Sequence, residues 1–339
     1  MILDLLFVLG GAALVLLGAD KLTDGSVGLA RRFSISETVI GLTVVAFGTS
    51  LPEFVVSLLA SLNGAASMGI GNVVGSNLFN TLMIVGVTAI VAPIIIQKST
   101  IRKDIPFSLL ASVILGALAL DQMLEDNASI NVLDRGDGIA LLGFFAVFMA
   151  YTFNIARPAT QTEQAADPQS PTLSDTAVTL SNSPSSAAPN MSLGRIILFI
   201  ILGLAGLIGG GEIFVNGATG VARELGVSEA VIGLTLVAGG TSLPELATSI
   251  IAARKGQSGM AIGNVIGSNL FNIFWILGVC SSISPMLVSG LTILDFLMLV
   301  ISGLFFWFFA KTQHRILRWE GCCLVAVYIA YLTWLIVQA

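Results

Sequence analysis

Charged residues are scarce in this sequence. Asp, Glu, Lys and Arg make up 10% of its 339 residues, whereas soluble domains carry roughly a quarter. Hydrophobic residues account for 55% of the chain. A bilayer-spanning helix needs about 20 mostly apolar residues, and stretches of that length recur along the sequence. The composition therefore excludes an ordinary soluble domain and predicts an integral membrane protein.

Histidine and cysteine are also rare. The one histidine, His314, lies in the basic segment 311–318, which marks a membrane edge. A lone histidine there argues against a His-ligated zinc or haem site. The three cysteines fall within apolar runs and imply no disulfide framework: Cys280, Cys322 and Cys323. P-loop, Gly-x-Ser-x-Gly and His-Glu-x-x-His segments are missing, so we expect neither enzymatic activity nor a cofactor. The net charge of −5 gives no reason to expect a nucleic-acid partner.

Ten apolar stretches predict an all-α membrane protein with ten transmembrane helices in two groups of five. Their expected bounds are 2–20, 37–62, 67–92, 104–121, 138–155, 194–216, 229–253, 259–283, 290–310 and 320–337. We interpret the first as a spanning helix and not a signal peptide, because no cationic segment precedes it. Residues 157–192 are rich in Pro, Ser and Thr and predict a disordered linker. The predicted units are a five-helix repeat at 1–156, this linker, and a second five-helix repeat at 193–339.

Lys and Arg are unevenly distributed between the two faces of the predicted bundle. With the N-terminus placed outside, thirteen of the fifteen basic residues fall on the cytoplasmic side, and only Arg135 and Arg223 fall on the other. By the positive-inside rule, this predicts a multi-pass protein of the cell (inner or plasma) membrane, with both termini outside and the linker in the cytoplasm.

An internal repeat is the most informative feature. Residues 36–87 align without a gap on 228–279, at an offset of 192, with about thirty identities. Because five predicted spans, an odd number, separate equivalent helices, the second copy crosses the membrane in the opposite sense. Inverted repeats of this kind are typical of secondary transporters, whose ion sites lie near mid-membrane where the copies meet.

The segment Gly-Thr-Ser-Leu-Pro-Glu occurs twice, at 48–53 and 240–245. A carboxylate in mid-membrane costs about 2.5–3.5 kcal/mol or more unless it meets a partner or water, so Glu53 and Glu245 predict a shared site. Thr49 lies four residues before Glu53, which would place both oxygens on one helix face. Each proline lacks an N–H, so the helices should kink here and free carbonyls near 46–48 and 238–240 as cation ligands.

A second segment, Gly-Asn-Val-x-Gly-Ser-Asn-Leu-Phe-Asn, occurs at 71–80 and 263–272. Ser76 and Asn80 are four residues apart, as are Ser268 and Asn272, so each helix presents a hydroxyl and an amide oxygen on one stripe. Carboxylate, hydroxyl, amide and backbone oxygens form a hard-ligand set that suits Ca²⁺ or Na⁺ and not zinc, copper or iron.

Packing and solvation offer alternative interpretations for the neighbouring residues. Helix packing would explain the repeated glycines, and hydrogen bonds between helices would explain Asn72, Asn77, Asn264 and Asn269. Asp20 and Glu212 also correspond at the offset of 192. We expect them toward helix ends, solvated at the membrane interface.

With these motifs, the chain resembles the sodium/calcium exchanger family of the Ca²⁺:cation antiporters, in its compact prokaryotic form. The resemblance covers both halves and implies ten helices, of which the second, third, seventh and eighth enclose the cation sites. Carried onto matching positions, it implies ligands at Ala46, Thr49, Ser50, Glu53, Ser76 and Asn80, and at Ala238, Thr241, Ser242, Glu245, Ser268 and Asn272. The expected partners are Ca²⁺, Na⁺ and the lipid bilayer.

One departure concerns the counter-ion. Many similar exchangers have Asp at the position of Asn272, whereas this chain has Asn in both halves, as proton-coupled relatives commonly do. Na⁺, H⁺ and K⁺ therefore stay open as counter-ions. A Ca²⁺/H⁺ antiporter is the nearest alternative function. A cation channel is a more distant one, because an inverted duplication argues against a symmetric pore.

Overall fold

The protein is described here by a computed structural model, which covers residues 1–124, 130–156, 191–226 and 238–338. Most of the predicted linker, at 157–190, and the start of the predicted span 229–253 lie outside the described residues.

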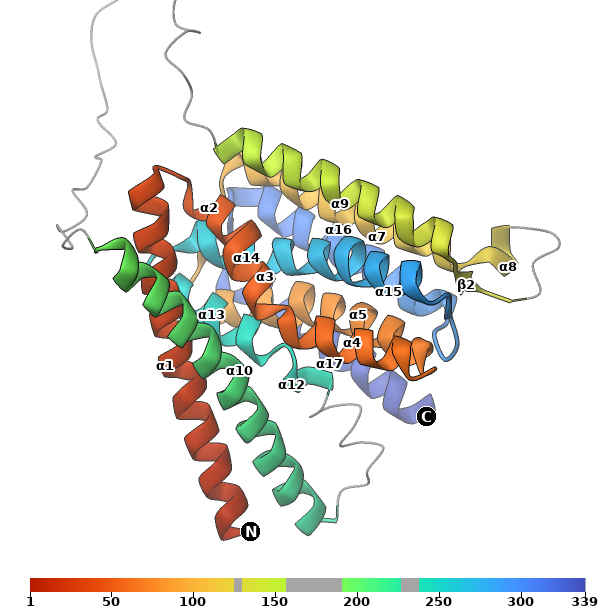
Figure 1. The fold of residues 1–339 in the computed structure, drawn as a ribbon, viewed down its shortest axis with the longest axis horizontal. Coiled ribbons are helices and arrows are strands. Elements are labelled where there is room, and N and C mark those ends of the chain that lie inside the picture. Colours follow the sequence, from red (N-terminus) through yellow and green to blue (C-terminus); the bar gives the residue numbers. More distant parts are fainter. Residues whose placement is uncertain (125–129, 157–190, 227–237, 339) are drawn as a thin grey trace, which may run out of the picture.

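Helices make up nearly all of the described chain (Figure 1). In the first half they are α1 (Ile2–Phe33), α2 (Glu37–Ile40), α3 (Ala46–Thr49), α4 (Leu51–Leu62), α5 (Ala66–Leu78), α6 (Val85–Val91), α7 (Ile105–Ala119), α8 (Asp121–Leu124) and α9 (Arg135–Ala156). In the second half they are α10 (Leu193–Glu224), α12 (Ala238–Gly240), α13 (Leu243–Arg254), α14 (Ser258–Leu270), α15 (Gly278–Ile283), α16 (Ile293–Gln313) and α17 (Arg318–Gln338). Wider π-helical turns join α2 to α3, α5 to α6 and α14 to α15, and precede α7: Gly41–Val45, Phe79–Ile84, Phe271–Leu277 and Thr100–Asp104.

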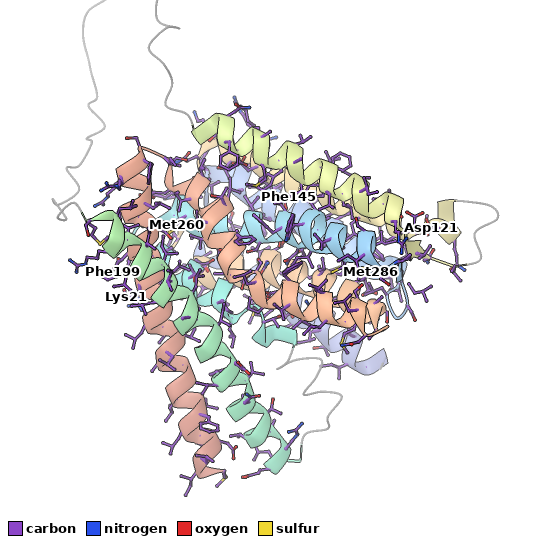
Figure 2. The ribbon with its side chains drawn as sticks, viewed as in Figure 1. Lys21, Asp121, Phe145, Phe199, Met260 and Met286 are labelled. Atoms are coloured by element: carbon purple, nitrogen blue, oxygen red, sulfur yellow. The ribbon has the colours of Figure 1, made fainter. Side chains whose placement is uncertain are left out.

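Seven helices in the described part are long and apolar enough to cross a membrane. The pair Glu37–Thr49 and Leu51–Leu62, which bends by 47° at its break, also meets this test when the two helices are taken together. The continuous helices Ala66–Val91 and Ser258–Ile283 form the centre, since 72% and 78% of their most apolar stretches are buried, against 17–39% in the other five. Apolar side chains of α1 and α10 point outward (Figure 2), as expected for helices that face lipid.

Helices α1 and α10 lie side by side at one end of the molecule and are inclined to the other helices (Figure 1). Glycines allow their backbones to touch: a Cβ on Gly18 would meet the Leu207 nitrogen at 2.7 Å, and one on Gly203 would meet the Leu22 nitrogen at 2.5 Å. Small residues serve this role in membrane helix pairs.

Both helices are longer than predicted. The apolar stretch of α1 gives way to polar residues near residue 20, but the helix continues to Ser34, which ends it in the left-handed conformation at φ 53°. Polar residues do not stop a helix; here they mark where the apolar surface ends. Asp20 and Glu212 consequently lie inside α1 and α10, so the expectation that they lie toward helix ends was wrong.

Two short antiparallel strand pairs join the halves. β1 (Ile94–Ile95) pairs with β4 (Arg315–Ile316), and β2 (Val132–Leu133) pairs with β3 (Met286–Leu287). The count of basic residues assigns both members of the first pair to the cytoplasmic side and both members of the second to the outside, so each pairing agrees with that assignment.

Candidate cation site

The predicted kink is confirmed at the first motif. Helix α3 ends at Thr49, Pro52 lies in the first turn of α4, and Ser50 between them departs from helical geometry at ψ 6°. Ser242 does the same before α13, at ψ 7°. Glu53 and Glu245 thus lie in the first turns of new helices, where the unpaired N–H groups favour negative charge.

Each glutamate contacts hydroxyl groups from the other half of the chain. The Ser242 hydroxyl donates to Glu53 Oε1 at 2.9 Å, and the Ser50 hydroxyl donates to Glu245 Oε1 at 3.1 Å. Thr49 likewise faces Glu245, whereas its spacing in the sequence had suggested a pairing with Glu53. The break at Ser50 turns the Glu53 carboxylate away from the turn that contains Thr49. The two copies of the first motif therefore hydrogen-bond to each other reciprocally.

The two carboxylates lie close together inside the protein. Glu53 and Glu245 are each only 1% exposed, and their charges repel each other. No lysine or arginine makes a salt bridge with either one in the part of the chain that the structure describes. Two buried carboxylates without a cationic partner are costly, so the arrangement calls for a bound cation or for protons.

The second motif passes through the π-helical turns, which hold Asn80 and Asn272. Amide–amide hydrogen bonds across the halves fix both side chains. The Asn80 amide donates to Asn269 Oδ1 at 3.1 Å, and the Asn272 amide donates to Asn77 Oδ1 at 2.9 Å. These bonds use the NH₂ groups and leave the Oδ1 atoms available, as cation binding requires.

Unpartnered oxygens gather at the predicted ligands. Among the described residues, ten buried side-chain oxygens have no hydrogen-bond partner, and six of them belong to residues that the sequence singled out. The six are Glu53 Oε2, Ser76 Oγ, Asn80 Oδ1, Glu245 Oε2, Ser268 Oγ and Asn272 Oδ1. They form three pairs related by the offset of 192. Buried polar groups are normally paired, and a set containing only oxygens is what a hard cation binds.

Asn72 and Asn264, for which the sequence allowed either helix packing or a role in the site, bond to the backbone of the two glutamates. The Asn72 amide donates to Ser57 Oγ at 3.1 Å and to the Glu53 carbonyl at 3.4 Å. Asn264 makes the matching bonds in the other half, to Ser249 Oγ and the Glu245 carbonyl, at the same distances. The signal was present in the spacing, because Asn72 lies four residues before Ser76 and continues its helical stripe.

Three further predicted ligands are Ala46, Ala238 and Thr241. The kink does not free the Ala46 carbonyl, which accepts from the Ser50 N–H at 3.0 Å and from the Thr49 hydroxyl at 3.4 Å. Ala238 begins α12, directly after residues outside the described chain. Thr241 is half-buried and faces the Glu53 carboxylate. The role of all twelve predicted positions as cation ligands stays a prediction.

The surroundings of the site differ between the two halves. A cavity of about 600 Å³ between α4, α10 and α13 is lined by Glu212, Asn216 and Thr241, and so reaches the edge of the site. At the position equivalent to Glu212, Asp20 is instead bound by Lys255 at 2.6 Å. Lys255 also binds Asp24, at 2.7 Å. Burial lowers the pKa of Lys255, but its contacts with Asp20 and Asp24 outweigh this and leave the pKa above its ordinary value of 10.5. We call this Asp20–Asp24–Lys255 contact the α1 clasp.

Comparison with known proteins gives a consistent result. The sequence matches the model of a family described as "Sodium/calcium exchanger protein" over residues 3–154 and 195–337. The sodium/calcium exchanger MaX1 of Methanosarcina acetivorans is 32% identical over 341 residues, 97% of each chain. The putative antiporter CaxA of Alkalimonas amylolytica is 33% identical over 335 residues, 98% of each chain. A structure of the sodium-calcium exchanger NCX_Mj soaked with Na⁺ and Sr²⁺ aligns with a TM-score of 0.78 at 34% identity, over 98% of both chains.

Proposed function

The chain belongs to the sodium/calcium exchanger protein family, and from this premise we propose that it exchanges Ca²⁺ for Na⁺ by alternating access at the oxygen site described above. One observation carries the proposal: the six unpartnered buried oxygens, three from each half. Their two carboxylates balance the charge of one Ca²⁺. Ca²⁺ takes six to eight oxygens at 2.3–2.6 Å, a number that these atoms and nearby carbonyls can supply.

We further propose the architecture that this mechanism needs. It consists of ten spanning helices in two inverted five-helix repeats, 1–156 and 193–339, joined by a cytoplasmic linker at 157–192, with both termini outside. The agreement of β1–β4 and β2–β3 with the sides assigned from basic residues supports this arrangement. The strict correspondence of the two motifs at an offset of 192 supports it as well.

Competition for the carboxylates would couple the two fluxes. Na⁺ and Ca²⁺ need the same pair of glutamates, so one ion must leave before the other binds. The cavity beside α10 reaches Thr241 on one side of the site, while the α1 clasp ties the equivalent place on the other side. We infer that ions enter along α10 in this state, and that sliding of α1 and α10 together, with opening of the clasp, exposes the site to the cytoplasm.

Proton coupling is the second candidate. Both positions 80 and 272 carry Asn, so the charge of the site resides in two buried carboxylates that repel each other. Such a pair can take up a proton in place of Na⁺. A Ca²⁺/H⁺ antiporter would then use the same residues with a different driving ion.

The proposal is tested by ⁴⁵Ca²⁺ flux into proteoliposomes, with Na⁺, H⁺ and K⁺ gradients imposed one at a time. Flux that follows the Na⁺ gradient alone is the expected result, and flux driven by a pH gradient without Na⁺ would replace it with the proton-coupled alternative. Glu53→Gln and Glu245→Gln should each reduce exchange at least a hundredfold. Glu320→Gln is the matched control, since Glu320 is a buried carboxylate that caps α17 through the Leu317 N–H at 2.7 Å.

A further inference from the structure

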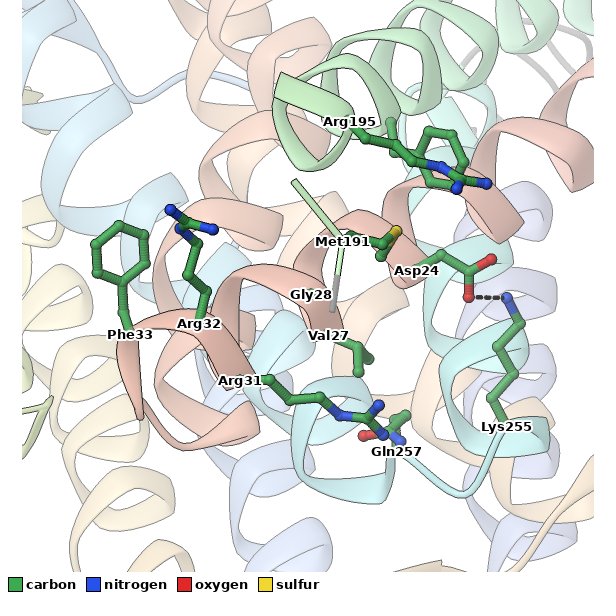
Figure 3. Close-up of a pocket in the computed structure, with 11 residues that line it drawn as sticks. Asp24, Val27, Gly28, Arg31, Arg32, Phe33, Met191, Arg195, Lys255 and Gln257 are labelled. Atoms are coloured by element: carbon green, nitrogen blue, oxygen red, sulfur yellow. Dashed lines mark hydrogen bonds and ion pairs between the residues drawn. The ribbon is translucent and has the colours of Figure 1, made fainter. Parts of the chain in front are cut away.

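A basic cavity separate from the cation site opens where α1, α10 and the turn between α13 and α14 meet. Its volume is about 830 Å³, within the usual range of small-molecule sites, roughly 300–1,000 Å³. Figure 3 shows its cationic side chains, which come from three segments far apart in the sequence: Arg31, Arg32, Arg195 and Lys255. Neither glutamate of the cation site lines this cavity.

Positive charge remains after the nearby acids are counted. Asp24 lines the cavity and Asp20 lies behind it, and both bind Lys255. Glu37 lies against the Gln257 side chain, near Arg31. Lys21 does not line the cavity; its Nζ lies 3.6 Å from Asp20 and 5.1 Å from the centre of the Phe199 ring. Among the described residues, the cavity wall itself carries four cations, from Arg31, Arg32, Arg195 and Lys255, and one carboxylate, from Asp24.

Apolar side chains form the rest of the wall. Phe199 lies under the Arg195 guanidinium, 5.2 Å from its centre, and Figure 2 shows Phe199 beside Lys21 at the end of α10. Val27, Phe33 and Met191 complete this surface, and Phe33 is 53% exposed. A small soluble anion needs no apolar wall, whereas a lipid presents a phosphate joined to hydrocarbon.

The position along the helices fits the same ligand. The cavity lies at the C-terminal end of α1 and the N-terminal end of α10, where the long apolar stretches give way to basic residues. Basic residues at the end of a membrane helix meet the headgroup layer. Arginine forks bind phosphate oxygens in pairs, and three guanidinium groups border this one space.

We propose that this cavity binds the phosphate headgroup of an anionic glycerophospholipid, with Arg31, Arg32 and Arg195 placed around the headgroup on different sides of the cavity (Figure 3) and Phe33 and Phe199 contacting the start of an acyl chain. The site bridges α1 and α10. A Cβ on Gly28 would meet the Met191 Cε at 2.8 Å and the Ile196 side chain at 3.1 Å, so glycine allows Met191 and Ile196 to pack directly against α1 beside the cavity. The lipid would therefore fasten the two helices to each other at this end.

Native mass spectrometry of the purified full-length protein tests the proposal with phosphatidylglycerol and phosphatidylcholine as probes. We expect one phosphatidylglycerol to be retained in preference to phosphatidylcholine. Each cation near a membrane surface changes affinity for anionic lipid about fivefold. Arg31→Gln/Arg32→Gln/Arg195→Gln should therefore weaken this retention about a hundredfold. The control Lys98→Gln/Arg102→Gln/Arg315→Gln removes three exposed cations assigned to the same face and should bind as the unmodified protein does.

Inorganic phosphate distinguishes a lipid from a soluble anion. Thermal unfolding should shift upward with phosphatidylglycerol and not with inorganic phosphate. An equal shift with phosphate alone overturns the assignment to lipid, and equal lipid retention by the cavity and control variants overturns the site. Should the triple variant fail to fold, Arg195→Gln alone carries the test, with about fivefold weaker retention expected and unchanged retention overturning the site.

Discussion

The amide pairs behind the cation site offer a sharp test of its chemistry. Asn272 points its oxygen away from Asn77 because its NH₂ group donates to Asn77 Oδ1 at 2.9 Å. Asn77→Ala removes this acceptor and the bond from the Asn77 amide to the Asn269 carbonyl, at 3.2 Å. The Asn272 amide is then free to turn its NH₂ group toward the cation. Asn269→Ala makes the same change to Asn80 in the other half, and so serves as an internal replicate.

The magnitude follows from the bonds lost. A buried neutral hydrogen bond contributes about 1 kcal/mol, which is roughly a fivefold preference for the orientation that binds a cation. Losing that preference lowers the competent fraction from about five-sixths to about one-half, and the apparent Ca²⁺ affinity should therefore weaken about twofold. Unfolding free energy should fall by about 2 kcal/mol, since Asn77 loses two buried bonds. Glu53→Gln should weaken affinity far more, because it removes a charge.

Isothermal titration with Ca²⁺ and thermal unfolding, measured on the same preparations, separate the two effects. Ser302→Ala is the control, because its buried hydroxyl donates to the Leu299 carbonyl of its own helix at 2.8 Å and makes no other hydrogen bond with the described residues. This change should cost stability and leave Ca²⁺ affinity intact. Asn77→Asp keeps an acceptor for Asn272 and should bind Ca²⁺ at least as tightly as the unmodified protein. Unchanged Ca²⁺ affinity in both alanine variants would show that these amides only pack the helices.

Three further outcomes are expected. Ca²⁺ at a hundred times its dissociation constant should raise the unfolding temperature by about 4 °C, and a chelator or Glu245→Gln should abolish the shift; a shift that persists in that variant would place the ion elsewhere. Gly11→Ala should lower the unfolding temperature, because its Cβ would meet the Phe214 nitrogen at 2.5 Å. Gly10→Ala is the control and should not lower it, since that Cβ meets no described atom within 4 Å. Equal unfolding temperatures of the two variants would argue against the α1–α10 contact. Lys255→Gln breaks the half-exposed α1 clasp, which contributes about 1 kcal/mol, so Ca²⁺ affinity measured from the cytoplasmic side in inverted vesicles should tighten about fivefold. The pKa of Lys255 is raised above 10.5 and the pKa of Asp20 is lowered below 3.8 by their contact, so the clasp is lost only as the pH rises through the folded value of Lys255 or falls through that of the carboxylates. The same Lys255→Gln effect is therefore expected at pH 6 and pH 8.

Local chemistry in the sequence anticipated the kinks and the membrane helices. Pro52 and Pro244 have no N–H to donate to the carbonyl four residues earlier, so the helical hydrogen bonding is interrupted there. The structure breaks the helix at Ser50 and Ser242 for that reason. Apolar stretches of the required length predicted the membrane class and the central helices. These features depend on a few neighbouring residues, so they can be read from one sequence.

Features that depend on contacts between halves could not be read in the same way. The spacing of Thr49 and Glu53 suggested that they act together, but the break between them redirects each to the opposite copy: Thr49 bonds to Asn264, and Glu53 bonds to Ser242. The π-helical turns that position Asn80 and Asn272 also had no signal in the sequence. Their wider backbone is stabilised by tertiary packing, which overrides the ordinary helical period. The ends of α1 and α10 were missed because polarity reports the membrane edge and not the helix end.

The exchange of hydroxyl groups between the two glutamates has a consequence for how such a protein can change over generations. Neither copy of the duplicated segment contains a complete binding site, since each acid is steadied by the serine of its counterpart. After duplication, a substitution in one copy of the motif would alter the surroundings of the glutamate in the other copy. This mutual dependence would keep the two motifs nearly identical, whereas segments that make no contact with the other copy could diverge in sequence.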